Sequence, residues 1–269
     1  MPDVTVVGHS TGVSWDERGG LRIGLRHDAT TDPTTWPDTV PAVAHLLEHG
    51  LDIPPGVTFL VGENGSGKST IVEAVAEALE IPPDGGSSDH IGGADRGRAS
   101  DRSNLGGRLR AARSGAMRGY QGRKGFFLRA ETMHRFVTYL EDTSQLDDDV
   151  PPGTHELHQL SHGESFVEML TSRWVAGAGI VLLDEPESAL SFTTSLALLD
   201  LLDQLATAER HVLCATHSPL LTALPGARIL QLDDAGITEV EWADLDVVRH
   251  WRAFLDSPGR YLRHLGERE

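Results

Sequence analysis

A nine-residue stretch at 62–70, Gly-Glu-Asn-Gly-Ser-Gly-Lys-Ser-Thr, constrains the fold of this chain more than any other part of the sequence. It matches the phosphate-loop pattern G-x-x-x-x-G-K-[ST]. The β-branched and aromatic run at 57–61 predicts a buried strand before it, and apolar residues at helical spacing follow it from residue 71. A strand, a glycine-rich loop and a helix in this order distinguish a functional phosphate loop from a chance match.

The residues of this loop suit a bound phosphate group. Glycines allow the backbone to turn its N–H groups inward, and the N-terminus of the following helix adds partial positive charge. Lys68 is expected to reach the β- and γ-phosphates of a nucleotide, and Ser69 is expected to ligate Mg²⁺. The predicted nucleotide-binding residues of the loop are Gly62, Glu63, Asn64, Gly65, Ser66, Gly67, Lys68, Ser69 and Thr70.

Two acids at the end of a second apolar run give a further nucleotide signal. The run at 179–183 predicts a strand buried on both faces of a parallel sheet, and Asp184 and Glu185 follow it directly. An acid at the carboxyl end of a strand beside the phosphate loop can hold Mg²⁺, which is the role expected of Asp184. Adjacent strand residues face opposite sides, so Glu185 is expected to have a different role, the deprotonation of the attacking water.

A histidine follows the next predicted strand. The run at 211–216 predicts this strand, and His217 stands 32 residues after Glu185. Its imidazole would contact the γ-phosphate and the attacking water at the same edge of the sheet. We therefore expect the catalytic residues to be Glu185, His217 and Lys68.

The order of the remaining segments predicts one α/β domain over residues 1–269. A mostly parallel central sheet is expected, with flanking helices, an antiparallel edge and a small helical or loop insertion. The core is expected at about 1–81, 124–145 and 160–243, with an arginine- and glycine-rich insertion at about 82–123 and C-terminal helices at about 244–269. Expected strands are 4–7 and 21–25 (an opening hairpin or edge), 125–130, and a hairpin of 228–232 with 237–242. Expected helices lie near 42–48, 71–81, 133–140, 161–174, 196–205, 245–255 and 259–265. Residues 84–107 are predicted to be a mobile loop or insertion, because they are polar and contain almost no apolar residues.

Charge is distributed unevenly along the chain. The net charge of −17 argues against general nucleic-acid binding, yet residues 96–129 contain ten basic residues and one acid, Asp101. Three interpretations stay open. The arginines could contact nucleic-acid phosphates, dock a partner protein, or pair with the many acids of the chain itself.

Three absences in the sequence favour a cytoplasmic location. Residues 1–12 show no basic segment followed by an apolar stretch, so no signal peptide is predicted. No apolar run approaches the ~18 residues that a membrane-spanning helix needs. Cys214 is the only cysteine, which excludes an internal disulfide.

A third motif stands at 160–164, Leu-Ser-His-Gly-Glu. Ser161 is a suitable N-cap for the apolar-faced helix that follows, and Glu164 completes a capping box three residues later. The Ser161 hydroxyl, the Gly163 backbone and the helix N-terminus would together bind an anion.

With these motifs in order, the chain resembles the ATP-binding-cassette (ABC) type of ATPase over about residues 57–265. It is most similar to the stand-alone, SMC-like ATPases of bacteria that are often grouped as AAA-family proteins. The resemblance implies ATP and Mg²⁺ as ligands, and a head-to-tail homodimer that forms around two ATP molecules. It also implies that Ser161, Gly163 and Glu164 of one subunit cap the γ-phosphate held by the other.

Many ATPases of this type carry an aromatic side chain that stacks on adenine. Trp36 lies 26 residues before Gly62, about where such an aromatic is expected. A loop aromatic that covers the core is the alternative interpretation, and the sequence does not separate the two.

Several residues depart from the pattern of transporter ATPases. Those proteins usually have Gly where His162 stands and Gln where Glu164 stands, and their loop after the acidic strand ends in Asp rather than Ser191. No glutamine follows the strand at 125–130, where Arg129 and Glu131 stand instead. These departures favour the SMC-like group. The alternatives are a nucleic-acid-associated ATPase of repair or defence, or the ATPase subunit of a membrane transporter or multi-protein assembly.

Overall fold

The computed structural model describes residues 20–82, 86–87, 103–114, 124–130, 175 and 177–263. The strands are β1 (Leu21–Leu25), β2 (Leu51–Ile53), β3 (Gly56–Gly62), β4 (Gly86–Ser87), β5 (Leu109–Arg113), β6 (Gly125–Arg129), β7 (Ile180–Asp184), β8 (His211–Thr216), β9 (Arg228–Asp233) and β10 (Gly236–Glu239). The α-helices are α1 (Pro41–His49), α2 (Lys68–Ala78), α3 (Leu105–Arg108), α7 (Phe192–Thr207), α8 (Asp246–Asp256) and α9 (Pro258–Leu262). Short 3₁₀ helices are η5 (Pro186–Ala189), η6 (Leu221–Ala223) and η7 (Trp242–Asp244).

The larger sheet has the strand order β10-β9-β3-β8-β7-β6-β4. The five strands from β9 to β6 are parallel, and β10 and β4 pair antiparallel at the two edges. The prediction of an α/β fold with a mostly parallel sheet is therefore confirmed. Since β8 lies between β3 and β7, the segments that follow these three strands emerge side by side at one edge of the sheet.

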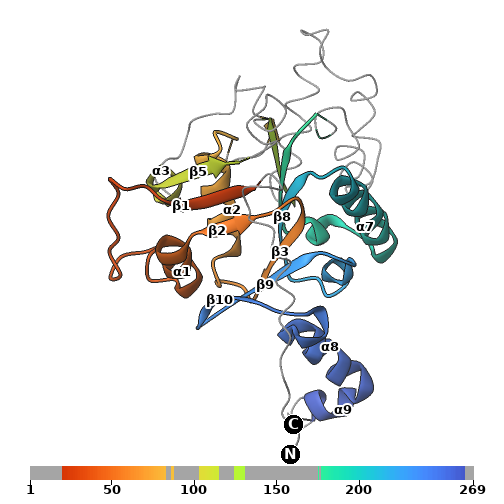
Figure 1. Cartoon of the computed structure of the whole chain (residues 1–269). Helices are drawn as coiled ribbons and strands as arrows, with labels where there is room; N and C mark the ends of the chain where they lie inside the picture. Colours follow the sequence, from red (N-terminus) through yellow and green to blue (C-terminus); the bar gives the residue numbers. More distant parts are fainter. Residues whose placement is uncertain are drawn as a thin grey trace, which may run out of the picture.

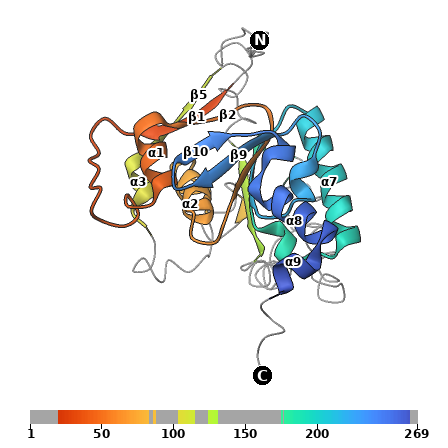
Figure 2. The same cartoon turned by 90° about the horizontal axis from the view of Figure 1, so that it is seen from below.

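The central strands are buried on both faces, as their continuous apolar runs predict. Phe59 and Leu183 belong to the cluster beneath α7, whereas Leu60 and Leu182 belong to the cluster that includes α1 and α2. Figures 1 and 2 show α7 on one face of the sheet and α1 and α2 on the other. Burial of each such side chain stabilises the fold by roughly 1.5–3 kcal/mol.

A second, three-stranded antiparallel sheet has the order β2-β1-β5. Strand β1 pairs with β2 on one side and with β5 on the other, so it is the central strand of this sheet. The expectation that residues 21–25 form an edge is therefore wrong. Their proposed hairpin partner, residues 4–7, lies outside the described residues.

The expectation of a loop over residues 84–107 is wrong near both ends of this segment, because β4 (Gly86–Ser87) pairs with β6 near its start. Helix α3 begins at Leu105, and β5 follows it within the segment assigned to the insertion. Leu105 and Leu109, four residues apart, are buried in the same cluster as α2. The polar, glycine-rich composition around this short apolar pair concealed it in the sequence. Within residues 103–114, Leu105 and Leu109 belong to the core.

Other boundaries differ by a few residues from the sequence prediction. Helix α2 ends at Ala78 rather than near Ile81, because Glu80 adopts a left-handed backbone conformation with φ 62°. The hairpin of β9 and β10 is confirmed, but β10 ends at Glu239, and Trp242 begins η7. The helices expected at 133–140 and 161–174 lie outside the described residues. Among the described helices, none has both the length and the apolar character needed to cross a bilayer.

Arg108, from the basic region at 96–129, is used inside the fold. The Arg108 guanidinium donates to both carboxylate oxygens of Asp38, with one Nη1–Oδ2 distance of 2.8 Å. The Asp38 side chain is only 5% exposed. The hydrogen bonds from Arg108 hold the pKa of Asp38 below its usual value. For Arg108, pairing with the chain's own acids is the interpretation that the structure supports.

We predict that Arg108→Met destabilises the protein by about 3–5 kcal/mol at pH 7, because it leaves a buried carboxylate without its partner. The lowered pKa of Asp38 means that the pair stabilises above the unfolded pKa of about 3.9 and that this contribution is lost as the pH falls through the lower folded value. Urea unfolding of wild type and variant should therefore show a large difference at pH 7 that shrinks towards pH 3.

The matched control is Arg110→Met, at an exposed residue of β5 only two positions away. It should change the unfolding free energy by no more than about 0.5 kcal/mol. Equal losses in the two variants would contradict a specific role for the Arg108–Asp38 pair.

Candidate active site

The loop at 62–70 joins β3 to α2 as the sequence predicts. Strand β3 ends at Gly62, and α2 begins at Lys68. Gly65 and Gly67 have φ values of 86° and 99°, in the left-handed region that glycine adopts without steric cost. A Cβ atom on Gly67 would also lie 2.9 Å from Val40 Cγ1. The glycines are thus required by the conformation and packing of the loop.

The Lys68 side chain lies back against its own loop. Its Nζ donates to the carbonyl oxygens of Gly62 at 2.8 Å and Glu63 at 3.0 Å, and it lies 3.9 Å from Glu185 Oε1. The side chain is 3% exposed, and burial lowers the pKa of Lys68 while Glu185 and Asp184 act in the opposite direction. The ammonium group therefore lies buried inside the loop, beside the acidic end of β7.

Asp184 connects the end of β7 to the phosphate loop. Ser69 Oγ donates to Asp184 Oδ1 at 2.9 Å, and Arg129 Nε lies 3.2 Å from Asp184 Oδ2. Arg129 also pairs with Glu73 of α2. Burial raises the pKa of Asp184 to about 6, and the Arg129 charge and the Ser69 hydrogen bond oppose this rise.

The structure thus brings Ser69 and Asp184 together, although they are far apart in sequence. It also adds Arg129 to the pair, a contact that sequence reasoning missed. The only signal was that Arg129 stands where transporter ATPases place a glutamine.

Glu185 stands where the chain turns out of the sheet. Its φ of 48° is left-handed, and its N–H donates to the carbonyl oxygen of Ala215 at 2.9 Å. Because β7 ends at Asp184, the alternation expected for strand residues does not continue to Glu185. Both carboxylates lie beside the phosphate loop, with Asp184 on Ser69 and Glu185 near Lys68.

His217 follows β8 and lies close to two carboxylates. Its Nδ1 is 3.7 Å from Glu185 Oε1 and 3.6 Å from Glu187 Oε1. Glu187 Oε1 also accepts hydrogen bonds from Thr216 Oγ1 at 2.7 Å and from the His217 N–H at 2.8 Å. Sequence reasoning missed Glu187, for which the only available signal was a third acid two positions after Glu185.

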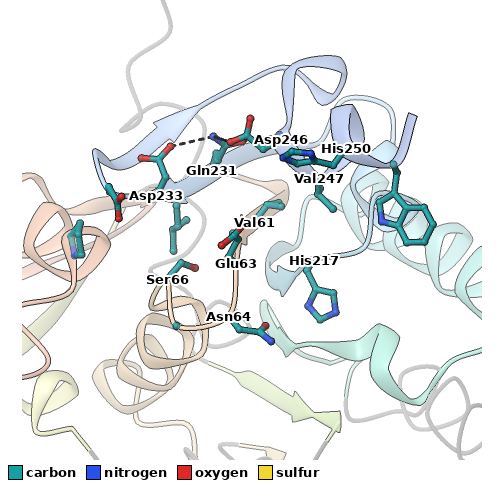
Figure 3. A pocket seen from close by; sticks show the side chains of 16 residues that line it. Val61, Glu63, Asn64, Ser66, His217, Gln231, Asp233, Asp246, Val247 and His250 are labelled. Atoms are coloured by element: carbon teal, nitrogen blue, oxygen red, sulfur yellow. Dashed lines mark hydrogen bonds between the residues drawn. The ribbon is translucent and has the colours of Figure 1, made fainter. Parts of the chain in front are cut away.

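Cavities lie on both sides of the phosphate loop. One of about 390 Å³ is lined by Trp36, Lys68, Ser69 and Glu185 together with other loop residues. The Trp36 side chain shares this space and is 55% exposed, which disfavours the interpretation that it covers the core. The other, of about 580 Å³, lies between the loop, His217, the β9–β10 turn and α8 (Figure 3).

The motif at 160–164 lies outside the described residues, so the structure does not place Ser161, Gly163 or Glu164. The same holds for Glu131.

We predict an unusual pH dependence for the nucleotide-free protein. With a folded pKa of about 6 against an ordinary value of 3.8, Asp184 binds a proton more tightly in the folded than in the unfolded chain. Its contribution to the unfolding free energy therefore decreases as the pH rises from about 4 to about 6. In Asp184→Asn this decrease is absent. The unfolding free energy of the variant, relative to that of the wild type, should therefore rise between pH 4 and pH 6, by on the order of 3 kcal/mol at most.

Chemical unfolding of both proteins at several pH values between 4 and 7 measures this shift. A difference that is independent of pH would show that Asp184 titrates normally in the fold.

Comparison with known proteins relates this chain to a protein family. A family model described as ABC transporter matches residues 48–188, just over half of the chain. A relative from Haemophilus influenzae, described as an uncharacterized ABC transporter ATP-binding protein, is 32% identical over 76 residues. That alignment covers 28% of this chain and 29% of the relative, so the chain matches less than a third of the relative's length.

Two solved structures also show similarity to the chain. One is an inward-facing ABC transporter described as of the metal-chelate type, with 18% identity over 77% of this chain and 80% of the other, and a TM-score of 0.42. The other is a bacterial ABC transporter cassette solved as a dimer, with 20% identity over 73% of this chain and 90% of the other, and a TM-score of 0.39. Scores this low carry no functional argument. The family match over residues 48–188 spans the phosphate loop and the acidic end of β7, and the chain therefore belongs to the ABC transporter family and is an ABC-type P-loop ATPase.

Proposed function

We propose that the protein is a Mg²⁺-dependent ATPase that forms an ATP-gated, head-to-tail homodimer. The observation that carries the catalytic part is the meeting of three strand ends at one edge of the sheet. Lys68 follows β3, Asp184 and Glu185 end β7, and His217 follows β8. Their contacts of 2.9–3.9 Å connect one loop, one acidic turn and one histidine. Lys68, Ser69 and Glu185 line the cavity that Trp36 also lines, and His217 lines the second cavity beside the loop.

The residues present fit a magnesium ion. Mg²⁺ prefers oxygen ligands and is usually held by one or two carboxylates, with waters and substrate phosphates completing its coordination. The Ser69 hydroxyl and the Asp184 carboxylate supply such oxygens within 2.9 Å of each other. Within the described residues there is no cluster of three or more acidic, histidine or cysteine side chains that could hold a metal ion alone, which agrees with a site completed by substrate. When bound, Mg²⁺ would neutralise charge that develops on the phosphate oxygens.

Glu185 is the proposed base for the attacking water. Its carboxylate is 31% exposed, so water can reach it, and it faces Lys68 and His217. Asp184, by contrast, is almost fully buried and engaged by Ser69 and Arg129. A pKa of about 6 leaves Asp184 mainly ionised at pH 7.5, as a metal ligand requires. The two adjacent acids thus have different environments and different proposed roles.

The remaining groups bind and orient ATP. The loop amides and Lys68 hold the phosphates, as helix N-termini and glycine-rich nests do. His217 contacts the γ-phosphate and the attacking water. The exposed Trp36 ring shares a cavity with Lys68 and Ser69, which supports its stacking on adenine.

Dimerisation is supported by the motif at 160–164 and by the family. Ser161, Gly163 and Glu164 would bind the γ-phosphate held by the second subunit. ATP bound at the interface would then hold the two subunits together, and its hydrolysis would allow them to separate.

The SMC-like, non-transporter assignment rests on departures from the transporter pattern. In the structure Arg129 pairs with Asp184 and Glu73 at the end of β6, so a cation occupies the region where a glutamine amide is usual. The family name and the description of the Haemophilus relative favour a second candidate, the ATPase subunit of a membrane transporter. Rapid hydrolysis by the chain alone, without a membrane partner, would favour the first.

We expect Glu185→Gln to reduce turnover by ~10²–10⁴-fold, because the base is lost while shape and hydrogen bonding are kept. ATP binding should persist. Asp184→Asn should weaken the binding of Mg²⁺-ATP as well as turnover, and Lys68→Ala should abolish ATP binding because the mobile cation facing the phosphates is lost. Phosphate release and calorimetric titration measure the two properties separately.

Near wild-type hydrolysis by Glu185→Gln would place the base elsewhere, with Glu164 and His217 as the next candidates. Loss of ATP binding in Glu185→Gln as severe as in Asp184→Asn would also contradict the division of roles.

A second prediction concerns assembly. In the Glu185→Gln background, where hydrolysis is blocked, Mg²⁺-ATP should double the molar mass measured by light scattering. Adding Ser161→Arg should keep the protein monomeric, because the arginine obstructs the signature motif, while ATP still binds to the loop. An unchanged mass with and without ATP would contradict the ATP-gated dimer.

A further inference from the structure

Glu187 reaches from one strand end to the next. It belongs to η5, directly after β7, but its carboxylate binds the residues that end and follow β8. Glu187 Oε1 accepts from Thr216 Oγ1 at 2.7 Å and from the His217 N–H at 2.8 Å. The side chain is 11% exposed, and its other oxygen, Oε2, is buried without a hydrogen-bond partner among the described residues.

A carboxylate in this environment has an energetic cost. A buried polar atom that lacks a partner loses its hydration without compensation, and a charged group loses more than a neutral one. The two hydrogen bonds to Oε1 are charge-assisted and therefore short and strong. Glu187 thus holds two donors, the Thr216 hydroxyl and the His217 amide, by hydrogen bonds, and the same oxygen lies 3.6 Å from the His217 ring nitrogen Nδ1.

Hydrogen bonds also fix the turn that follows β7. The Glu185 N–H donates to the carbonyl oxygen of Ala215 at 2.9 Å, and Ser188 Oγ donates to the carbonyl oxygen of Glu185 at 2.7 Å. The turn that carries Glu185 is therefore fixed to β8 by its own backbone. Glu187 adds a link to His217, so the backbone positions of Glu185 and His217 are fixed relative to each other.

The imidazole is held only loosely, because its Nδ1 lies 3.7 Å from Glu185 Oε1 and 3.6 Å from Glu187 Oε1, beyond hydrogen-bond distance. The His217 side chain is 49% exposed, and the described residues make no hydrogen bond to its ring. Figure 3 shows the ring directed into the cavity beside Asn64 of the phosphate loop. With so few constraints on the side chain, the direction of the ring depends on the peptide from which it projects.

We propose that Glu187 is a positioning residue that fixes the Thr216–His217 peptide and thereby directs the His217 imidazole towards Glu185 and the phosphate loop. The inference rests on the proposed function, because it concerns the orientation of the His217 imidazole during ATP hydrolysis. Glu187 touches no reacting atom in this scheme and acts only through His217.

Three variants separate this role from general stabilisation. Glu187→Met keeps the length of the side chain but removes the oxygen acceptor, and kcat should fall by ~10- to 100-fold, as small displacements of reacting groups do, with little change in KM for ATP. Glu187→Gln keeps an oxygen acceptor at the same place and should retain near wild-type kcat. Glu241→Gln, at an exposed position of the chain, is the matched control for the loss of one charge and should have no effect.

A double-mutant cycle tests the route of action. If Glu187 acts through His217, Glu187→Met should cause no further loss of kcat in a His217→Ala background. A loss as large as in the wild-type background would overturn the proposal. A loss in Glu187→Gln equal to that in Glu187→Met would also overturn it, because the acceptor is still present.

A measurement without nucleotide makes the test independent of ATPase activity. The imidazole signals of His217 in a ¹H–¹³C NMR spectrum are identified by their absence in His217→Ala. They should broaden in Glu187→Met and stay sharp in Glu187→Gln, because both variants lose the charge near Nδ1 but only Glu187→Met loses the hydrogen-bond acceptor. Equally sharp His217 signals in Glu187→Met would refute the positioning role. If Glu187→Met does not fold, Glu187→Asp replaces it, since the shorter carboxylate cannot reach both donors and should disturb the same signals.

The two hypotheses fail in different ways. A wild-type protein that does not hydrolyse ATP would contradict the proposed function, while the NMR comparison would still decide whether Glu187 orders His217.

Discussion

The parallel pairing of β3, β8 and β7 is the constraint on which the site depends. Val61 lies opposite Thr216, and Asp184 lies opposite Ala215, so the three strands end at nearly the same level. Parallel strands place their carboxyl ends at one edge, where α/β proteins bind their ligands. The phosphate loop, the acidic turn and the histidine therefore meet without any long-range rearrangement of the chain, and a shift in the register of β8 would separate His217 from the other two.

Electrostatics at this edge are unbalanced in the protein alone. Asp184, Glu185 and Glu187 lie around Lys68, and all three oppose the effect of burial on its pKa. Among the described residues, Arg129 is a second cation at this edge, paired with Asp184 and with Glu73. An incoming triphosphate adds still more negative charge. A divalent cation shared between protein carboxylate and phosphate resolves this conflict, which gives a physical reason for expecting Mg²⁺-ATP rather than free ATP as the ligand.

Local patterns allowed much of the site to be predicted from the sequence. The loop at 62–70, the strand ending in Asp184 and the strand before His217 each carry their signal within a few residues. The missed contacts are of another kind. Arg129, Glu187 and Leu105 act on residues of other elements, and their effect depends on which strands become neighbours. Polar composition around Leu105 and the ordinary appearance of an acid in a turn at Glu187 gave no local sign of these contacts.

The left-handed backbone at Glu185 has a consequence for how this protein can change. A non-glycine residue in that region costs of order 1–3 kcal/mol, which the contacts of the turn with Ala215 and Ser188 must offset. Glycine would adopt the same conformation freely, and it would remove the proposed base. Selection for heat resistance and selection for turnover thus pull this position in opposite directions. A laboratory search for more thermostable variants without an activity screen would favour glycine at position 185, and under the proposed role of Glu185 those variants would lose ATP hydrolysis.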